Sequence, residues 1–322
     1  MRKGIVSFVV LLMVAVIASG CSSTQTTEYP QKPIEIIVPW TAGGASDLTV
    51  RALAKGMEKE LGQPVMVTNK EGAGGLTGAA YGVSAKPDGY TLVWIGGKNA
   101  APDVYQSTYT YTAKDYQCVA QVSVGVRVLA VARDSKFQTL EEFVEYTKNT
   151  EVKYAHTGRG NGPHMAGVVL ADTYGLRMTD VPYSSDAESL LALLRGDTEV
   201  AFMNLAAALP QEEAGEIRIL AFLNREKVDS VAHIPSFNDT NYPIDTDVLV
   251  CNAICAPLNV PEKIVKTLEK AIEKAMQADE FKSTMGGLGV VTGYMNSAAC
   301  TRSMADFIEK VGPIIQKVGI YK

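Results

Sequence analysis

Regular alternation between short apolar strands and amphipathic helices is the sequence feature that most restricts the fold. Residues 34–38 (Ile-Glu-Ile-Ile-Val) predict a buried strand, and a helix is expected from an N-cap at Ser46 to Leu61. Asp47 lies in the first turn of this helix, and Gly62 ends it. The same order of strand, loop and helix returns along the chain. It predicts an α/β fold with parallel sheets, in which ligands bind at the carboxyl ends of the strands.

Periodicity, turn residues and caps predict the further elements. Strands are expected at residues 65–68, 90–95, 152–155, 200–202 and 217–223, with a short strand ending at 181–183. Helices are expected at residues 76–85, 140–149, 163–174, 186–194 and 262–278, with a last helix capped by Asn296 or Ser297.

Three glycine-rich loops lie at strand-to-helix junctions, at residues 41–45, 72–75 and 158–162. Glycine lets the backbone approach a ligand closely, and a helix N-terminus presents N–H groups without intrahelical partners. Local dipoles would have to hold an anion there, because the net acidic chain exerts no general attraction on anions. The alternative is that each loop is only a tight turn. Three loops at equivalent junctions favour an anion site.

Signatures of common enzyme classes are missing from the sequence. It has no Gly-x-Ser-x-Gly elbow, no Ser-x-x-Lys and no Gly-x-x-x-x-Gly-Lys-Ser/Thr loop. Residues 72–78 nearly match the dinucleotide motif Gly-x-Gly-x-x-Gly, but the last glycine comes one place late. The histidines His156, His164 and His233 form no closely spaced ligand pair. We therefore assign no catalytic residue and expect neither a metal nor a cofactor.

Composition is that of an ordinary globular protein. The 322 residues suggest about two domains, and 47% of them are hydrophobic and 20% charged. The formal charge is −5, whereas a nucleic-acid-binding protein would need a basic excess. Nucleic acid is therefore not an expected partner.

The N-terminus has the pattern of an exported protein. Two basic residues precede an apolar run at residues 5–17, which is short for a membrane span. Small residues then lead to Cys21, and this stretch resembles the bacterial lipobox. The resemblance implies a signal peptide at residues 1–20, lipid on Cys21 and a polar tether over residues 21–31. The alternative is an ordinary signal peptide with a chance cysteine. The expected location is extracytoplasmic, with the lipid on Cys21 anchoring the chain to the bacterial cell membrane.

Four cysteines follow, at Cys118, Cys251, Cys255 and Cys300. An exported protein can pair its cysteines. The spacing of Cys251 and Cys255 is not Cys-x-x-Cys and no histidine lies near them, so buried thiols are favoured over a metal site. The sequence leaves the pairing open.

Short motifs keep one order and spacing from about residue 32 to the C-terminus. They are KPIEIIVPW at 32–40, AGG at 42–44 with Asp47, LGQPV at 61–65, NKEGAGG at 69–75, PDGYTL at 87–92, YA at 154–155, GxG at 158–160, His164, VPY at 181–183, LxG at 194–196 and AP at 256–257. Each motif alone is weak. Their succession resembles the receptors of tripartite tricarboxylate transporters, which are Bug-type extracytoplasmic solute-binding proteins.

This resemblance implies a two-domain α/β fold like that of the type II periplasmic binding proteins, with a ligand cleft between domains joined by two crossovers. Domain 1 would comprise residues 32–128 and 253–322, and domain 2 residues 129–252. The cleft would close on one small organic carboxylate without a covalent step. The implied partners are that ligand and the membrane permease subunits of a tripartite tricarboxylate-type transporter, and a monomer is expected.

The resemblance also implies which residues bind the ligand. One carboxylate end would lie between the first strand–helix loop and the glycine-rich loop of the second domain. The resemblance points to Trp40, Thr41, Ala42, Gly43, Gly44, Thr157, Gly158 and Asn161. The further candidate ligand residues of this chain are Gly74, His156, Tyr183, Asp186 and Asn204.

Several of these positions carry open alternatives. His156 replaces the small residue usual in the family and, like Arg159 in the same loop, could add a cation contact. Asp186 could receive an ammonium or hydroxyl group of the ligand or could N-cap the next helix, and the cap is slightly favoured. His164 matches a recurrent family histidine and is favoured as a helix residue over a direct ligand. Trp40 could stack on the ligand or belong to the core.

The sequence thus predicts a lipid-anchored solute receptor that serves a membrane transporter and has no enzymatic activity. Two other functions remain open. A sensing module for a membrane signalling partner would have the same fold, and an extracytoplasmic hydrolase is less favoured because nucleophile motifs are missing. The sequence does not decide which carboxylate is bound.

Overall fold

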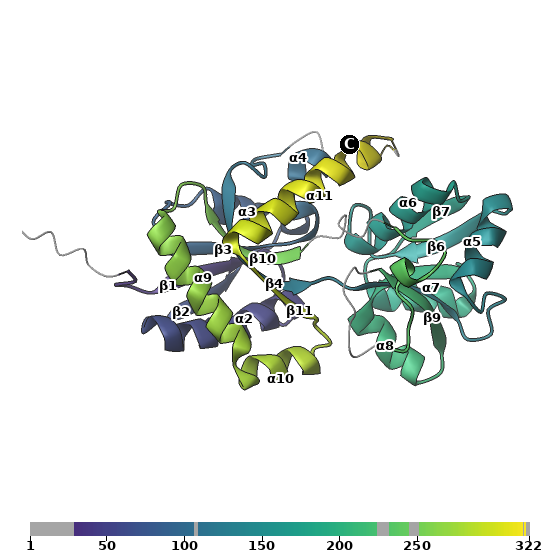
Figure 1. Ribbon diagram of the computed structural model, residues 1–322, viewed down its shortest axis with the longest axis horizontal. Coiled ribbons are helices and arrows are strands. Elements are labelled where there is room, and N and C mark those ends of the chain that lie inside the picture. The colour runs from purple at the N-terminus through teal and green to yellow at the C-terminus, as the bar shows by residue number, and fades with distance from the viewer. Residues whose placement is uncertain (1–28, 106–108, 224–231, 245–250, 318, 320–322) are drawn as a thin grey trace, which may run out of the picture. The chain divides into compact units, whose positions relative to one another are not determined.

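Two β-sheets, each with helices on both faces, make up the computed structural model (Figure 1). It describes residues 29–105, 109–223, 232–244, 251–317 and 319. The predicted signal peptide, Cys21 and most of the predicted tether lie outside these residues. Within the described part of the chain, no helix combines the length and the apolar character needed to span a membrane.

The first sheet has six strands in the order β11-β4-β10-β3-β1-β2. They are β1 (Ile34–Val38), β2 (Val65–Asn69), β3 (Thr91–Ile95), β4 (Tyr116–Val124), β10 (Cys251–Pro257) and β11 (Thr292–Asn296). Strand β1 is parallel to β2 and β3, whereas β10 is antiparallel to both β3 and β4, and β11 is antiparallel to β4. The prediction of parallel sheets is therefore wrong for part of this sheet, because β10 inserts between β3 and β4 from late in the chain.

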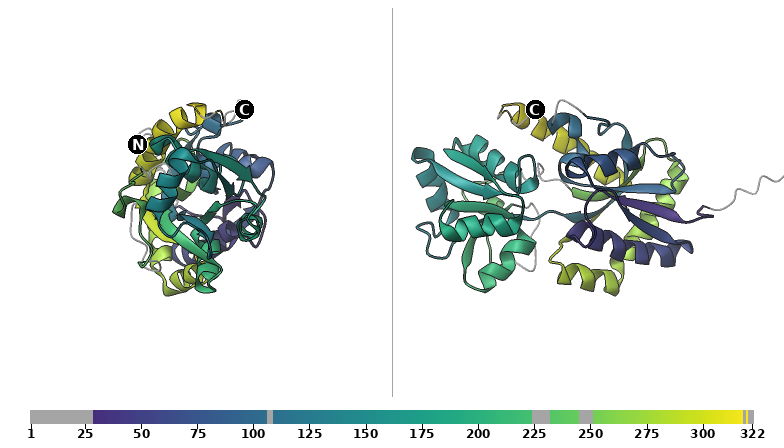
Figure 2. Two further views of the ribbon diagram at one scale, coloured as in Figure 1. Left: turned by 90° about the vertical axis from the view of Figure 1, so that its right-hand side faces the viewer. Right: turned by 180° about the vertical axis from the view of Figure 1, so that it is seen from behind.

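Helices cover both faces of the first sheet. They are α2 (Ala45–Leu61), α3 (Leu76–Val83), α4 (Pro102–Tyr105), α9 (Glu262–Gln277), α10 (Asp279–Gly287) and α11 (Ser297–Lys317), with short 3-10 turns η1 (Ala73–Gly75) and η2 (Gly97–Ala100). Figures 1 and 2 show α2, α9 and α10 on one face and α3 and α11 on the other. Buried residues of α3 and α11 share one core cluster with the sheet, including Val83, Val93 and Met304.

The second sheet has five strands in the order β7-β6-β8-β5-β9. Its elements are β5 (Arg127–Ala132), α5 (Leu140–Asn149), β6 (Val152–His156), α6 (Gly162–Tyr174), β7 (Met178–Pro182), α7 (Asp186–Arg195), β8 (Val200–Asn204), α8 (Leu205–Glu213), β9 (Ile217–Leu223) and η4 (Phe237–Asp239). Strand β6 is parallel to β7 and β8, but β5 is antiparallel to β8 and β9. This sheet too is mixed rather than parallel.

Alternation along β5 divides the core of the second sheet into two layers. Leu129 and Val131 belong to the cluster under α5 and α6, whereas Val128 and Ala130 belong to the cluster under α7 and α8. Successive side chains of a strand point to opposite faces, so a strand covered on both sides is apolar throughout. Arg127, the first residue of β5, is the exception to this apolar pattern.

The chain passes between the two sheets twice, between β4 and β5 and between β9 and β10. The predicted domain boundaries at 128/129 and 252/253 fall inside β5 and β10. The division into two ligand-binding domains remains a prediction.

The sequence signals for helix ends are mostly correct. Gly62 ends α2 in the left-handed conformation, and the Asn296 side chain accepts a hydrogen bond from the Ala299 N–H at the start of α11. The predicted N-cap at Ser46 is wrong, because α2 begins at Ala45 with Gly44 as its cap.

Cys118 in β4 and Cys300 in α11 form a disulfide. The structure thus gives, for these two residues, the pairing that the sequence left open. The bond lies in the core cluster between the sheet and α11, which also contains the buried Cys255. The two cysteines are 182 residues apart in the sequence, so no local spacing could have revealed the pair.

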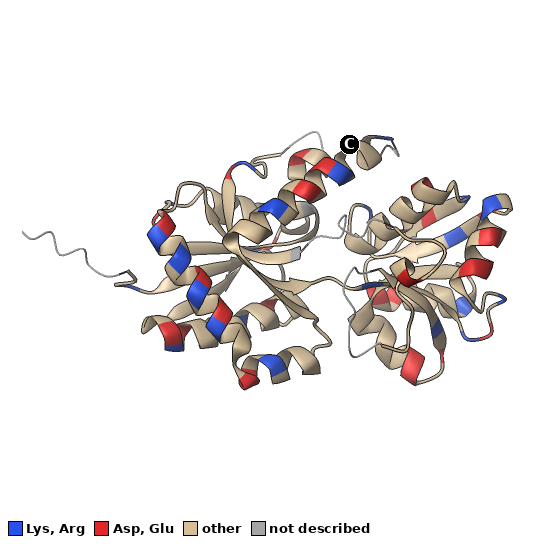
Figure 3. Ribbon diagram, viewed as in Figure 1, with Lys and Arg blue, Asp and Glu red and all other residues tan. Residues whose placement is uncertain are grey.

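Charged side chains gather on the outer helices. Figure 3 shows Lys and Glu alternating along α9. Lys274 of α9 pairs with Glu60 of α2 at 2.6 Å, and Lys59 of α2 pairs with Glu280 of α10 at 3.2 Å. Exposed pairs of this kind contribute little to stability, because water and salt screen them. The contact of α2 with α9 therefore depends mainly on its apolar side chains.

Candidate ligand-binding cleft

A cleft of about 220 Å³ is lined by residues of both sheets and their loops. Its lining consists of Trp40, Ser46, Gly74, Gly96, Gly97, Arg127, Thr157, Asn161, Gly162, Pro163, Asn204 and Asn252. A second cavity of about 160 Å³ shares Ser46, Arg127, Asn204 and Asn252 with this cleft. Thr157 follows β6 and Asn204 ends β8, so the cleft lies where ligands bind in α/β sheets, at strand carboxyl ends.

Part of the sequence-predicted ligand set lines this cleft, namely Trp40, Gly74, Thr157, Asn161 and Asn204. The remaining residues of that set do not line it: Thr41, Ala42, Gly43, Gly44, His156, Gly158, Tyr183 and Asp186. Ligand contact at all of these positions remains a prediction. Ser46, Arg127 and Asn252 line the cleft and were missed by sequence reasoning.

The first strand–helix loop is organised by the buried carboxylate of Asp47. It accepts hydrogen bonds from the Gly43 N–H at 2.8 Å, from Arg51 Nε at 2.9 Å and from Asn69 Nδ2 at 2.9 Å. Burial alone would raise the pKa of Asp47, but the hydrogen bonds from Arg51, Gly43 and Asn69 outweigh it and lower the pKa. The Gly43 amide is thus already bonded within the protein, and the residues that flank this loop, Trp40 and Ser46, line the cleft.

The second loop owes its glycines to backbone conformation and close packing. Gly74 lines the cleft with a φ of 64°, a left-handed conformation that glycine adopts without strain. Gly78 lies in α3 against neighbouring backbone, where a Cβ atom would lie 2.2 Å from the carbonyl oxygen of Lys70. These conformational and packing roles explain why the sequence nearly matches a dinucleotide motif, and no bound nucleotide is needed to explain it.

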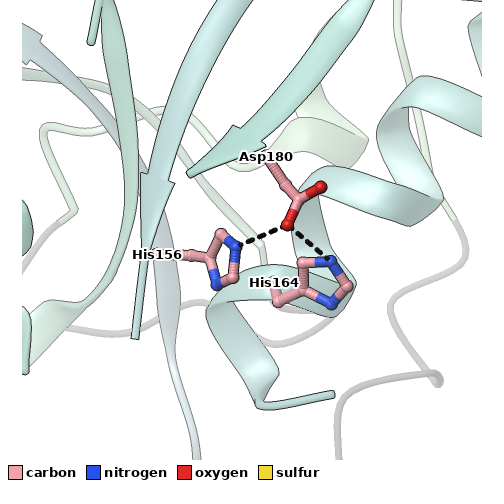
Figure 4. Close-up of side chains that lie close together, drawn as sticks. All are labelled: His156, His164 and Asp180. Atoms are coloured by element: carbon pink, nitrogen blue, oxygen red, sulfur yellow. Dashed lines mark hydrogen bonds and ion pairs between the residues drawn. The ribbon is translucent and has the colours of Figure 1, made fainter. Parts of the chain in front are cut away.

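The third loop is supported by a cluster of His156, His164 and Asp180 (Figure 4), and Arg159 of the same loop bonds to Asp180. Arg159 donates to both carboxylate oxygens of Asp180, at 2.7 and 3.2 Å. His156 Nε2 lies 3.3 Å from the same carboxylate. The Gly160 N–H donates to His164 Nδ1 at 3.1 Å. His156 and Arg159 are therefore engaged with Asp180, and the cluster fixes the loop between β6 and α6.

Three metal-ligand atoms of this cluster, on His156, His164 and Asp180, lie within 4.8 Å of one another. Their hydrogen bonds do not suit a metal ion. His164 Nδ1 accepts from the Gly160 N–H, so a neutral His164 carries its proton on Nε2, the atom that faces Asp180. Arg159 also occupies both oxygens of that carboxylate. The geometry fits a structural role for the cluster.

Both histidines of the cluster are neutral at pH 7. Burial lowers the pKa of His156, and the hydrogen bond with Asp180 offsets this only in part. Burial, together with repulsion from His156, lowers the pKa of His164 to about 4. An unfolded histidine titrates near pH 6.5, so as the pH falls the unfolded chain takes up protons first. The stability from these neutral histidines is complete above about pH 6.5 and is lost as the pH falls towards 4.

We expect His164→Asn to weaken this pH dependence. The Asn side-chain oxygen can still accept from the Gly160 N–H, but it does not titrate. Between pH 6.5 and 4 a histidine shifted this far contributes roughly 2–3 kcal/mol to the loss of unfolding free energy, and the variant should lack most of that loss. Urea unfolding at several pH values measures it. His233→Asn, which changes an exposed histidine outside this cluster, is the matched control. Equal profiles for His164→Asn and the wild type would contradict the assignment.

Asp186 does not N-cap α7, which corrects the favoured alternative. Ser185 is the cap, and its hydroxyl accepts from the Glu188 N–H. The Asp186 carboxylate instead accepts from Asn204, from the backbone N–H at 3.3 Å and from Nδ2 at 2.6 Å. A carboxylate can only accept hydrogen bonds, so the NH₂ group of Asn204 faces Asp186. The side-chain oxygen of Asn204 is then available to the cleft.

Arg127 is the charged residue that sequence reasoning missed. It stands directly opposite Asn204 in the β5–β8 pair, and both line the cleft. Its Nε is buried and has no hydrogen-bond partner among the described residues. Burial lowers the pKa of Arg127 to about 10, with Asp186 as a nearby opposing charge, so the guanidinium stays charged at pH 7. The sequence did contain a signal for this residue: a single basic residue directly precedes the apolar run 128–132. Charged residues next to such buried runs need partners.

The sequence of this chain is similar to those of known proteins. Residues 49–320 match the model of the tripartite tricarboxylate transporter family receptor. The UPF0065 protein in the gbd 5′ region of Cupriavidus necator is 30% identical over 314 residues, which cover 95% of this chain and 93% of that protein.

Solved structures share the fold. A TctC solute binding protein from Polaromonas has a TM-score of 0.82 at 25% identity, over 90% of this chain and 99% of that one. An R. palustris protein with adipate has a TM-score of 0.75 at 23% identity, over 91% and 99% of the two chains, which shows the fold alone. The predicted periplasmic-binding-protein-like α/β fold is confirmed.

Proposed function

This chain belongs to the tripartite tricarboxylate transporter family of receptors, which are periplasmic solute-binding proteins rather than enzymes, and we propose that its cleft captures a small organic carboxylate. The loaded receptor would deliver this ligand to the membrane permease subunits of a tripartite tricarboxylate-type transporter. Capture proceeds by domain closure around the ligand, without a covalent step. The receptor acts as a monomer, and lipid on Cys21 anchors it to the cell membrane.

The observation that carries this proposal is the N-terminus of α6 in the lining of the cleft. Asn161, Gly162 and Pro163 all line it. Asn161 is the N-cap, yet its side chain makes no capping bond and donates instead to the Thr157 carbonyl at 2.5 Å. The first turn of a helix carries about half a positive charge and presents unpaired N–H groups. A carboxylate, which is an anion with two acceptor oxygens, satisfies both.

Thermal unfolding of the chain that begins after Cys21 tests this proposal. The panel is succinate, malate, glutarate, adipate, citrate, glutamate and benzoate, with glucose as the control. An acid at 100 times its dissociation constant stabilises the folded state by about 2.7 kcal/mol. The expected rise in melting temperature is about 5 °C or more, at roughly 2 °C per kcal/mol for a chain of this size.

The pattern of shifts decides between outcomes. A shift with one class of acid and none with glucose supports the receptor and identifies its ligand class. No shift with any acid, for protein that mass spectrometry of the unfolded sample finds empty, contradicts carboxylate capture. If the chain binds an acid but co-purifies with a membrane kinase instead of a permease, its role is ligand sensing and not delivery to a transporter.

A further inference from the structure

Among the described residues that line the cleft, only Arg127 carries a full charge. Within the described part of the chain, it forms no ion pair with a carboxylate within 4 Å. Asp186, the acid whose charge acts on it, is already engaged with Asn204 through both carboxylate oxygens. Its Nε–H has no hydrogen-bond partner although water does not reach it. A charged group removed from water in this way requires an acceptor.

Two glycines shape the space that the guanidinium occupies. A Cβ atom at Gly125 would lie 2.1 Å from Arg127 Nη1, and a Cβ atom at Gly162 would lie 2.2 Å from Arg127 Nε. The guanidinium is therefore packed between the backbone before β5 and the first residue of α6. This contact places a full positive charge beside the positive end of the α6 dipole. The two positive charges repel each other, and a bound anion would remove this repulsion.

We infer that Arg127 forms a direct ion pair with a carboxylate of the ligand, at the junction of the cleft and the smaller cavity that it also lines. This inference rests on the proposed function and adds the residue that supplies the charge. Arg127 and the α6 N-terminus act on the same carboxylate group. The planar guanidinium can bind both oxygens of a carboxylate, which an ammonium group cannot match.

The neighbours of Arg127 fit this assignment. Trp94 lines the smaller cavity, and its Nε1–H is likewise buried with no hydrogen-bond partner in the described part of the chain. Asn204, opposite Arg127, has its amide group committed to Asp186 and keeps its oxygen as an acceptor. The cleft thus offers donors for a carboxylate beside an acceptor for a hydroxyl group. An organic acid with a polar substituent would satisfy both.

A consequence of this arrangement is that the ligand-free protein holds an unpaired charge. Replacing Arg127 by an apolar side chain of similar length should therefore not lower the melting temperature of the ligand-free protein, and should raise it by a few degrees. Ligand binding should change in the opposite direction. A residue whose role was only structural would lower the melting temperature when replaced.

The experiment compares Arg127→Met, Arg127→Lys and Arg133→Met with the wild type. Calorimetric titration with the panel acids gives each dissociation constant, and thermal unfolding gives ligand-free stability. We expect Arg127→Met to weaken binding about 100-fold, because it leaves a buried carboxylate without its charged partner. Arg127→Lys should lose less. Arg133 is exposed just beyond β5 and outside the cleft, so Arg133→Met should bind like the wild type.

Failure of this inference can be told apart from failure of the proposed function. Wild-type protein that binds none of the acids contradicts the proposed function. Wild-type binding that Arg127→Met leaves unchanged overturns the Arg127 assignment alone. Lower ligand-free stability of Arg127→Met with an unchanged ligand-induced shift also overturns it, since that combination marks a structural residue.

Discussion

Gly78→Ala is expected to lower the free energy of unfolding by about 3 kcal/mol, which corresponds to roughly 6 °C in melting temperature. A Cβ atom at Gly78 would lie 2.2 Å from the Lys70 carbonyl oxygen and 2.9 Å from Cα of Pro39. Both neighbours are backbone at the ends of β2 and β1, and Lys70 is tied to Val38 by a backbone hydrogen bond of 2.9 Å. Because neither can rotate away, α3 must move as a whole.

Chemical unfolding of Gly78→Ala and of a matched helical glycine measures this effect. Gly286 lies in α10, is exposed, and has open space where its Cβ atom would lie. Gly286→Ala should therefore leave stability unchanged or raise it by about 0.5–1 kcal/mol. Gly78→Ala should also weaken ligand binding, because Trp40 and Gly74 next to the displaced segments line the cleft. A Gly78→Ala variant as stable as Gly286→Ala would show that α3 tolerates the shift.

Local patterns predicted the elements whose signals lie within one segment. The helix over residues 140–149 and the strand over 217–223 have the expected bounds, because caps and apolar periodicity act within a few residues. Strands β4, β5 and β10 were not predicted. Their places depend on partners far away in the sequence: Cys255 of β10 lies opposite Val93 on one side and Cys118 on the other.

The wrong prediction of the N-cap of α7 shows a limit of local sequence signals. Ser185 and Asp186 are adjacent and both are good cap residues. Ser185 becomes the cap because its backbone is extended, while Asp186 turns to Asn204, which is 18 residues further along the chain. Sequence cannot choose between neighbouring caps when a distant side chain decides the matter.

The candidate site was predicted only in part for a related reason. Glycine-rich loops are visible in the sequence, and two of the three bring predicted residues, Gly74, Thr157 and Asn161, to the cleft. Whether a loop amide is available to a ligand depends on internal acceptors, and the Gly43 amide is bonded to Asp47. Arg127 reaches the cleft through the antiparallel pairing of β5 with β8, which the expectation of parallel sheets did not include.

Loss of the Cys118–Cys300 disulfide is expected to lower the free energy of unfolding by about 2–5 kcal/mol. The bond joins β4 to α11 across 182 residues of sequence, so breaking it releases a large closed loop in the unfolded chain. The double variant Cys118→Ala/Cys300→Ala should therefore melt roughly 4–10 °C lower than the wild type. A reducing agent should lower the melting temperature of the wild type towards that of the double variant and leave the double variant unchanged.

Cys255→Ala is the matched control, because Cys255 is buried in the same core cluster as the disulfide. Losing its sulfur removes a small apolar group and should cost about 1 kcal/mol. The Cys255→Ala variant should keep the full sensitivity to the reducing agent, since that sensitivity belongs to the disulfide. If the reducing agent leaves the wild-type melting temperature unchanged, the bond adds nothing to stability. The anchoring of α11 on the sheet would then depend on its apolar contacts, among them those of Met304.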